Sequence, residues 1–240
     1  MATDRRAFLA LTGLSVLGGC LGSAGPGGSG TAGPDTTDTA DADPLESPVA
    51  TAPIPNTPAE FRYATMGAGE ESAVTYYGSW KCPYCAQFSQ GFLEEIVTNF
   101  IEPTGLSLTF RAIGYIGGEP FLGPDAARAA RAGLTVWNLD PGTYGAYHEY
   151  LLANQPPEGK RWATVDRLVR FAREAGVGPI EKLRSHVTSG RYEEAVRATA
   201  AAAQQAGVES TPILVIDGRT VSPLDAPGRT RRLLDQAASD

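Results

Sequence analysis

This chain of 240 residues has few of the side chains that usually bind metal ions or nucleic acid. It contains three cysteines and two histidines, and His148 and His186 are far apart in the sequence. A structural zinc site takes four ligands, most often two closely spaced pairs, so this composition argues against a zinc centre. Lysine occurs only at positions 81, 160 and 182, and the net charge of −7 argues against a nucleic-acid-binding protein.

The first 20 residues lack an apolar run long enough to span a membrane. Residues 7–19 are mildly apolar, whereas a membrane-spanning helix needs about 20 apolar residues. Residues 4–9, with two adjacent arginines, resemble a twin-arginine export signal, and residues 17–20 resemble a lipobox that ends at Cys20. We therefore expect residues 1–19 to be an export signal peptide and Cys20 to become the lipidated first residue. An ordinary signal peptide with an incidental cysteine is the alternative.

Residues 20–57 have almost no large apolar side chains. Residues 22–30 are rich in glycine, and Asp, Thr, Ala and Pro dominate residues 35–58. A segment of this composition cannot bury enough apolar surface to offset its loss of conformational entropy. The sequence therefore predicts a flexible linker over residues 20–57 and a folded domain over residues 58–240.

The strongest chemical signal in the chain is a pair of cysteines, Cys82 and Cys85. A strand-like run, residues 73–77, precedes the pair. Apolar residues at spacings of three and four follow it over residues 88–101, as expected for a helix. Cys82 is thus expected at a strand-to-helix turn, with Pro83 at the first helical position, where its missing N–H costs nothing.

The N-terminus of a helix gives two thiols at this spacing different chemistry. Unpaired backbone N–H groups and the helix dipole favour a thiolate at Cys82, and thiols at such positions have pKa values of roughly 3.5–7.5. Cys85 lies one turn further in, so we expect an exposed nucleophile at Cys82 and a buried resolving thiol at Cys85. This asymmetry is typical of thiol–disulfide exchange through a mixed disulfide. A structural disulfide or a metal site is the alternative.

The remaining pattern predicts an α/β fold. The alternating run 106–113 completes a strand–helix–strand unit whose two strands should be parallel. Helical patterns fill residues 124–207, where His148 lies on an apolar stripe and is expected to be a hydrogen-bonded core residue. The buried-type strand 213–216 followed by Asp217-Gly218 predicts a hairpin, and a final helix follows.

The order of these elements resembles the thioredoxin fold with an inserted α-helical subdomain, here at about residues 120–207. Two motifs carry the resemblance: residues 77–88, which contain Cys-Pro-Tyr-Cys, and residues 207–218, which contain Thr-Pro before a strand. On these motifs the chain is similar to the DsbA-like family of exported thiol–disulfide oxidoreductases over about residues 60–238.

The resemblance implies roles for six residues: catalysis by Cys82 and Cys85, redox tuning by Pro83 and Tyr84, and substrate binding by Thr211 and Pro212. It also implies a cis peptide bond before Pro212, and neither a metal nor an organic cofactor. Lys81, next to the nucleophile, is expected to be exposed, where it either stabilises the thiolate or is simply solvated.

The predicted function is that of an exported thiol–disulfide oxidoreductase, tethered to the outer face of the cytoplasmic membrane by a lipid on Cys20. Its predicted partners are unfolded or reduced exported proteins and a membrane redox partner of the DsbB type. Two alternatives stay open: a thiol reductase of the same fold outside the cytoplasm, and a non-catalytic peptide-binding module. A reduction potential of about −120 mV would indicate an oxidant, and one of about −270 mV a reductant.

Overall fold

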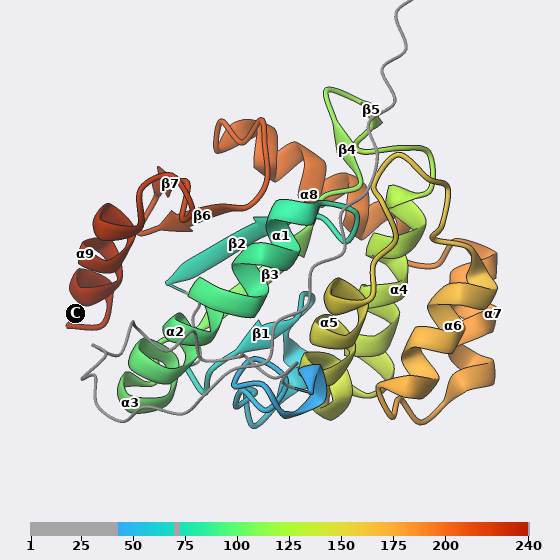
Figure 1. Cartoon of the computed structure of the whole chain (residues 1–240), viewed down its shortest axis with the longest axis horizontal. Coiled ribbons are helices and arrows are strands. Elements are labelled where there is room, and N and C mark those ends of the chain that lie inside the picture. The colour runs from blue at the N-terminus through green and yellow to red at the C-terminus, as the bar shows by residue number, and fades with distance from the viewer. Residues whose placement is uncertain (1–42, 70–72, 240) are drawn as a thin grey trace, which may run out of the picture. The chain divides into compact units, whose positions relative to one another are not determined.

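The computed structural model describes residues 43–69 and 73–239. Their centre is a five-stranded sheet with the strand order β1-β3-β2-β6-β7 (Figure 1). Strands β2 and β3 are parallel and the other neighbours are antiparallel. The strands of this sheet are β1 (Thr65–Met66), β2 (Val74–Gly78), β3 (Leu108–Ala112), β6 (Ile213–Ile216) and β7 (Arg219–Val221).

The crossover between β2 and β3 is a long helical segment that begins directly after Cys82. It consists of α1 (Pro83–Phe88), α2 (Glu94–Ile96) and α3 (Glu102–Thr104), joined by two wider π-helical turns. The segment ends at Gly105, whose φ of 76° lies in the left-handed region that favours glycine. The predicted parallel strand–helix–strand unit is therefore confirmed.

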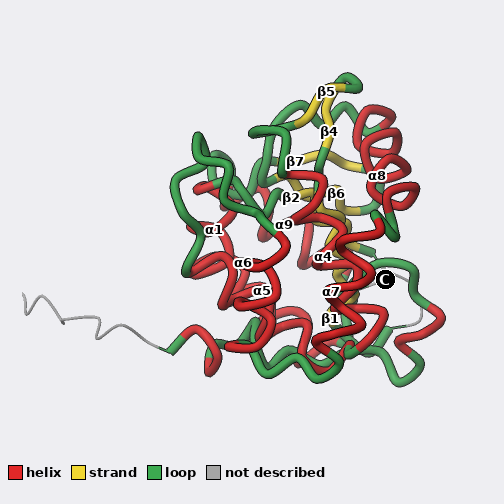
Figure 2. The backbone as a smooth tube through the Cα atoms, turned by 90° about the vertical axis from the view of Figure 1, so that its right-hand side faces the viewer, coloured by secondary structure: helices red, strands yellow, loops and turns green. Residues whose placement is uncertain are grey.

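Most of the remaining helices come between β3 and β6. Five α-helices follow a short hairpin in this stretch, and one more α-helix closes the chain. Figure 1 shows α4–α7 gathered at one side of the sheet and α9 at the other, and Figure 2 shows strands of the five-stranded sheet between helices, with the β4–β5 hairpin above them. The elements are β4 (Tyr115–Ile116), β5 (Glu119–Pro120), α4 (Ala126–Leu139), α5 (Tyr144–Ala153), α6 (Val165–Glu174), α7 (Ile180–Ser189), α8 (Glu193–Gln205) and α9 (Pro227–Ala237).

The core joins the sheet to these inserted helices through a cluster of aromatic rings. Trp80, just after β2, packs edge-on against Phe110 of β3 and Tyr147 of α5, with ring centroids 5.1 and 5.6 Å away. Gly133 of α4 makes this approach possible, because a Cβ atom there would lie 2.7 Å from the Trp80 ring. The cysteine turn is thus packed directly against the insertion.

The folded part of the chain begins earlier than the sequence predicts. Residues 43–57, assigned to a flexible linker, pack against the domain: Val49 is fully buried, and Gly67 N donates to Pro53 O at 2.7 Å. Gly145 of α5 admits this segment, because a Cβ atom there would lie 2.6 Å from the Val49 carbonyl oxygen. The predicted boundary at residue 58 is therefore wrong. A segment with few apolar side chains can still pack against the domain here, because the neighbouring helix α5 leaves room for its backbone.

Candidate active site

Both cysteines of the described part of the chain lie where β2 leads into α1, Cys82 directly before the helix and Cys85 within it. Cys82 is the residue before the helix, with extended backbone angles of −84° and 120°, and Pro83 takes the first helical position. The Cys82 carbonyl accepts hydrogen bonds from Cys85 N at 3.1 Å and Ala86 N at 3.3 Å. The predicted placement of Cys82 at a strand-to-helix turn is confirmed.

Both cysteines are free thiols, and neither is open to solvent. Cys82 is 4% exposed and Cys85 is 1% exposed. The Cys82 thiol donates to the carbonyl oxygen of Thr211 at 3.4 Å, and Ser79 N donates to Cys85 Sγ at 3.4 Å. The expectation of an exposed Cys82 is wrong, because the segment around Thr211 covers its sulfur.

The two thiols nevertheless differ strongly in acidity. The pKa of Cys82 is lowered to about 6, chiefly by the hydrogen bond from the Cys85 thiol and against the opposing effect of burial. The Thr211 side chain and the backbone N–H groups of Cys85 and Tyr84 also contribute to this lowering. Burial raises the pKa of Cys85 well above its ordinary value, and the neighbouring Cys82 raises it more. The N–H groups at the helix N-terminus thus help to lower the pKa of Cys82, as predicted, but the adjacent Cys85 thiol lowers it most.

The segment that faces Cys82 comes from the far end of the chain. Strand β6 pairs antiparallel with β2, so that Ile213 lies beside Tyr77. Thr211 and Pro212, just before β6, therefore lie next to the cysteine turn, and both are buried. The Thr211–Pro212 peptide bond is cis, as the resemblance implied.

A pocket opens beside this pair of segments, between the start of α1 and the turn that follows β7. Its volume is about 430 Å³. Tyr84, which lies between the two cysteines in sequence, is 62% exposed and is the one exposed large apolar side chain of the described residues. The pocket is lined by Tyr84, Gln87, Ser210, Thr211, Pro212, Ser222, Leu224 and Asp225.

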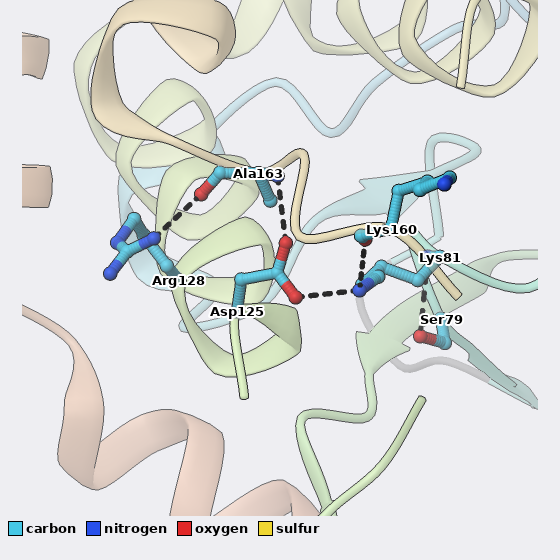
Figure 3. Close-up of polar contacts among 6 residues, drawn as sticks. All are labelled: Ser79, Lys81, Asp125, Arg128, Lys160 and Ala163. Carbon is cyan, nitrogen blue, oxygen red and sulfur yellow. Dashed lines mark hydrogen bonds and ion pairs between the residues drawn. The ribbon is translucent and has the colours of Figure 1, made fainter. Parts of the chain in front are cut away.

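Lys81 is buried, whereas the sequence predicted an exposed side chain. Its side chain is 1% exposed, and Nζ forms a buried ion pair with Asp125 Oδ1 at 2.5 Å (Figure 3). The expectation of an exposed lysine is wrong, because Asp125, at the start of α4, supplies a buried counter-charge. No sequence pattern linked positions 81 and 125.

A second buried polar group lies beneath the cysteines, on α5. His148 is fully buried, and its Nε2 lies 3.0 Å from Ser89 Oγ, which confirms the predicted hydrogen-bonded core histidine. Ser89 Oγ also donates to Glu149, which is 1% exposed. Burial lowers the pKa of His148 to about 3 and raises the pKa of Glu149 to about 7. His148 is therefore neutral at pH 7, and its 3.8 Å contact with Glu149 is not an ion pair.

The described residues form neither a cluster of metal ligands nor a membrane-spanning helix. Over residues 43–69 and 73–239, no three or more His, Cys, Asp and Glu side chains gather in a way that could hold a metal ion. Within the same ranges, none of the helices has the length and apolar character needed to cross a bilayer. The predicted export signal and Cys20 lie outside the described residues.

A comparison with protein families finds a match over most of the described domain. The model of the family described as "Thioredoxin" matches residues 64–236. Among curated proteins, the chain is 24% identical over 168 residues to the "Probable disulfide bond formation protein D" of Bacillus cereus, covering 68% of this chain and 75% of that protein. It is also 24% identical to the "Disulfide bond formation protein D" of Bacillus subtilis, covering 62% of this chain and 64% of that protein.

Solved structures show the same fold. Oxidised BdbD from Bacillus subtilis superposes with a TM-score of 0.65 at 20% identity, covering 80% of this chain and 99% of that one. DsbA from Chlamydia trachomatis superposes with a TM-score of 0.61 at 22% identity, covering 72% and 90% of the two chains. The predicted thioredoxin fold with inserted helices is confirmed.

Proposed function

The chain belongs to the thioredoxin family as a DsbA-like thiol–disulfide oxidoreductase, and we propose that Cys82 and Cys85 carry its reaction with exported proteins. The observation that supports this most is the contrast between the two thiols. Cys82, with a pKa of about 6, is largely a thiolate at pH 7, whereas burial keeps Cys85 protonated. A thiolate is the form that attacks and leaves in disulfide exchange.

In the oxidising direction, a substrate thiolate attacks Cys82 Sγ of the Cys82–Cys85 disulfide. The bond between the two enzyme sulfurs breaks, Cys85 takes up a proton, and a mixed disulfide joins the substrate to Cys82. A second substrate thiolate then attacks the substrate sulfur and releases Cys82 as a thiolate. The substrate has lost two electrons and the enzyme has gained them, so a membrane redox partner of the DsbB type must remove them.

Substrate binding is assigned to the segment around Thr211 and to the pocket beside it. The Thr211 carbonyl lies 3.4 Å from Cys82 Sγ, so a chain bonded to that sulfur must pass along this segment. Pro212 offers no N–H to compete for backbone hydrogen bonds with the substrate. Pro83 and the exposed Tyr84, beside the nucleophile, are assigned to redox tuning.

The acidity of Cys82 favours an oxidant, but only modestly. Lowering the pKa of a thiol from 9.0 to about 6 stabilises the reduced enzyme at pH 7. The gain at pH 7 is about 1.4 kcal/mol, because only the part of the shift between about pH 6 and pH 7 stabilises the thiolate there. This amounts to about 30 mV, against the roughly 150 mV that separates a strong oxidant from thioredoxin. The measured reduction potential of the couple therefore decides between oxidase and reductase.

Trapping experiments test the roles of the two thiols. Cys85→Ser should accumulate stable mixed disulfides with reduced exported proteins, because no resolving thiol remains, and its thiolate should titrate well below an ordinary cysteine. Cys82→Ser should trap nothing, because its remaining thiol is buried and protonated. Mixed disulfides are counted on non-reducing gels, and the thiolate is followed by absorbance near 240 nm against pH. If Cys82→Ser is the variant that traps substrates, the assignment of the two sulfurs is reversed.

The location proposed for this reaction is the outer face of the cytoplasmic membrane. Its support is in the sequence: a twin-arginine pattern, a lipobox-like stretch ending at Cys20, and a linker composition after it. In this proposal the linker runs from Cys20 to the point near residue 43 where the chain joins the domain.

A further inference from the structure

The residue before the nucleophile is fixed to the helical insertion. The ammonium group of Lys81 donates to Asp125 Oδ1 at 2.5 Å and to the Lys160 carbonyl at 3.0 Å (Figure 3). Asp125 lies directly before α4, and its other carboxylate oxygen accepts from Ala163 N at 2.8 Å. One side chain of the β2–α1 turn is thus bound to two separate parts of the insertion.

The loop that takes part in these contacts runs from Asn154 to Ala163, between α5 and α6, and is called the insertion loop below. Arg128 of α4 holds its far end, donating to the Ala163 carbonyl at 2.9 Å. At its near end, Gln155 Nε2 donates to the carbonyl of Cys82 itself at 3.2 Å. The insertion loop therefore holds the turn both at the nucleophile and at the residue before it.

Neither stability nor charge accounts for the ion pair. Burying two charges costs about as much as their attraction returns, and apolar replacements of such pairs are often neutral or stabilising. The groups that lower the pKa of Cys82 are Cys85, Thr211 and nearby backbone N–H groups, and Lys81 is not among them. The pair carries no net charge, because Asp125 neutralises Lys81. What it does fix is the position of the backbone that carries Cys82.

From these contacts we propose that Lys81, Asp125 and Gln155 are positioning residues, through which the helical insertion holds Cys82 in its geometry for thiol exchange. The proposal rests on the proposed function of the Cys82–Cys85 site. Displacing Cys82 lengthens its contacts with the Cys85 thiol and with the N–H groups at the start of α1, which stabilise the thiolate. A small displacement of a reacting atom is enough to slow a reaction strongly.

The test is a double variant, Lys81→Met with Asp125→Leu. It replaces the two charged side chains by apolar ones of similar size and leaves the net charge unchanged. We expect its melting temperature to fall by a few degrees, because the buried Ala163 N–H loses its acceptor. We expect the pKa of Cys82 to rise by about one unit, and its exchange with a reduced unfolded protein to slow about tenfold. Arg131→Met with Glu193→Leu is the matched control. It removes a partly buried ion pair between α4 and α8, in which Glu193 also pairs with Arg197 and accepts from Tyr115. Among the described residues, no hydrogen bond or ion pair of its side chains reaches the cysteine turn. Both readouts should match the wild type in this control.

A folded double variant with the Cys82 pKa and the exchange rate of the wild type would overturn the proposal. If the double variant does not fold, Gln155→Leu tests the proposal instead. It removes only one hydrogen-bond donor, and the side chain is half-buried. A raised Cys82 pKa with slower exchange supports the proposal, and wild-type values overturn it. The titration needs no substrate. A wild type that exchanges disulfides with no protein would therefore refute the proposed function, while the positioning role is still decided by the titration.

Discussion

Glu149 should make the stability of the protein depend on pH, and a single substitution can isolate the effect. The side chain is 1% exposed on α5 and accepts a hydrogen bond from Ser89 Oγ. Its pKa is raised from 4.5 to about 7, chiefly by burial and also by the charge of Glu94. The folded protein therefore keeps a proton between these pH values that the unfolded chain releases.

The sign and size of the effect follow from linkage. A carboxyl group with a raised pKa in the folded state contributes stability that is fully present below about pH 4.5 and is lost as pH rises through about 7. A shift of about 2.5 units corresponds to about 3 kcal/mol of unfolding free energy. Buried His148 acts in the opposite sense, because its pKa is lowered to about 3 and its contribution is lost as pH falls below 6.5.

The variant Glu149→Gln removes the ionisation and keeps an acceptor for Ser89. Because His148 is present in both proteins, its contribution cancels in the difference between them. We expect the variant to gain about 3 kcal/mol of unfolding free energy relative to the wild type between pH 4.5 and 8. Urea denaturation of the oxidised proteins at several pH values measures this, with the cysteines removed from the titration by the disulfide.

Glu174→Gln, on the exposed side of α6, is the control for a change of surface charge. A difference between Glu149→Gln and the wild type that stays constant within about 1 kcal/mol over this pH range would refute the reasoning. It would mean that the carboxyl group at position 149 ionises in the folded state as readily as in the unfolded chain.

Two further predictions concern Cys20 and Pro212. Cys20→Ser should move the protein from the membrane fraction to the medium with its redox activity intact, because a lipid on this residue would supply the anchor. A wild type that is already soluble, or a variant that stays with the membrane, contradicts the lipobox interpretation. Pro212→Ala should accumulate mixed disulfides with exported proteins, because it adds a backbone N–H next to the Thr211 carbonyl, where the substrate chain is proposed to pair. Wild-type levels of mixed disulfide on non-reducing gels would show that Pro212 has no role in substrate release.

The fold was predictable from the sequence where local patterns decide it. The period of the apolar residues after Cys85 and the alternation before Ile113 predicted the strand–helix–strand unit, and Asp217-Gly218 predicted the last hairpin. These signals arise within a few residues of chain, so they need no knowledge of tertiary contacts.

The misplaced residues are those whose surroundings come from distant segments. Cys82 is buried by Thr211, 129 positions away, and Lys81 is buried by Asp125, 44 positions away. Val49 is buried because Gly145 leaves room for its backbone. The local sequence around these residues does not reveal their distant partners, because each of these contacts depends on how separate elements pack.

The antiparallel pairing of β6 with β2 has a consequence for the synthesis of this protein. The contact that covers the Cys82 sulfur is made by one of the last segments of the chain to be synthesised. A nascent chain that ends before residue 211 has Cys82 but not the segment that covers its sulfur. Contacts between residues so far apart also form slowly, because a long loop must close first. The Cys82 thiol is therefore uncovered during synthesis, and it gains its contact with Thr211 only when the chain is nearly complete.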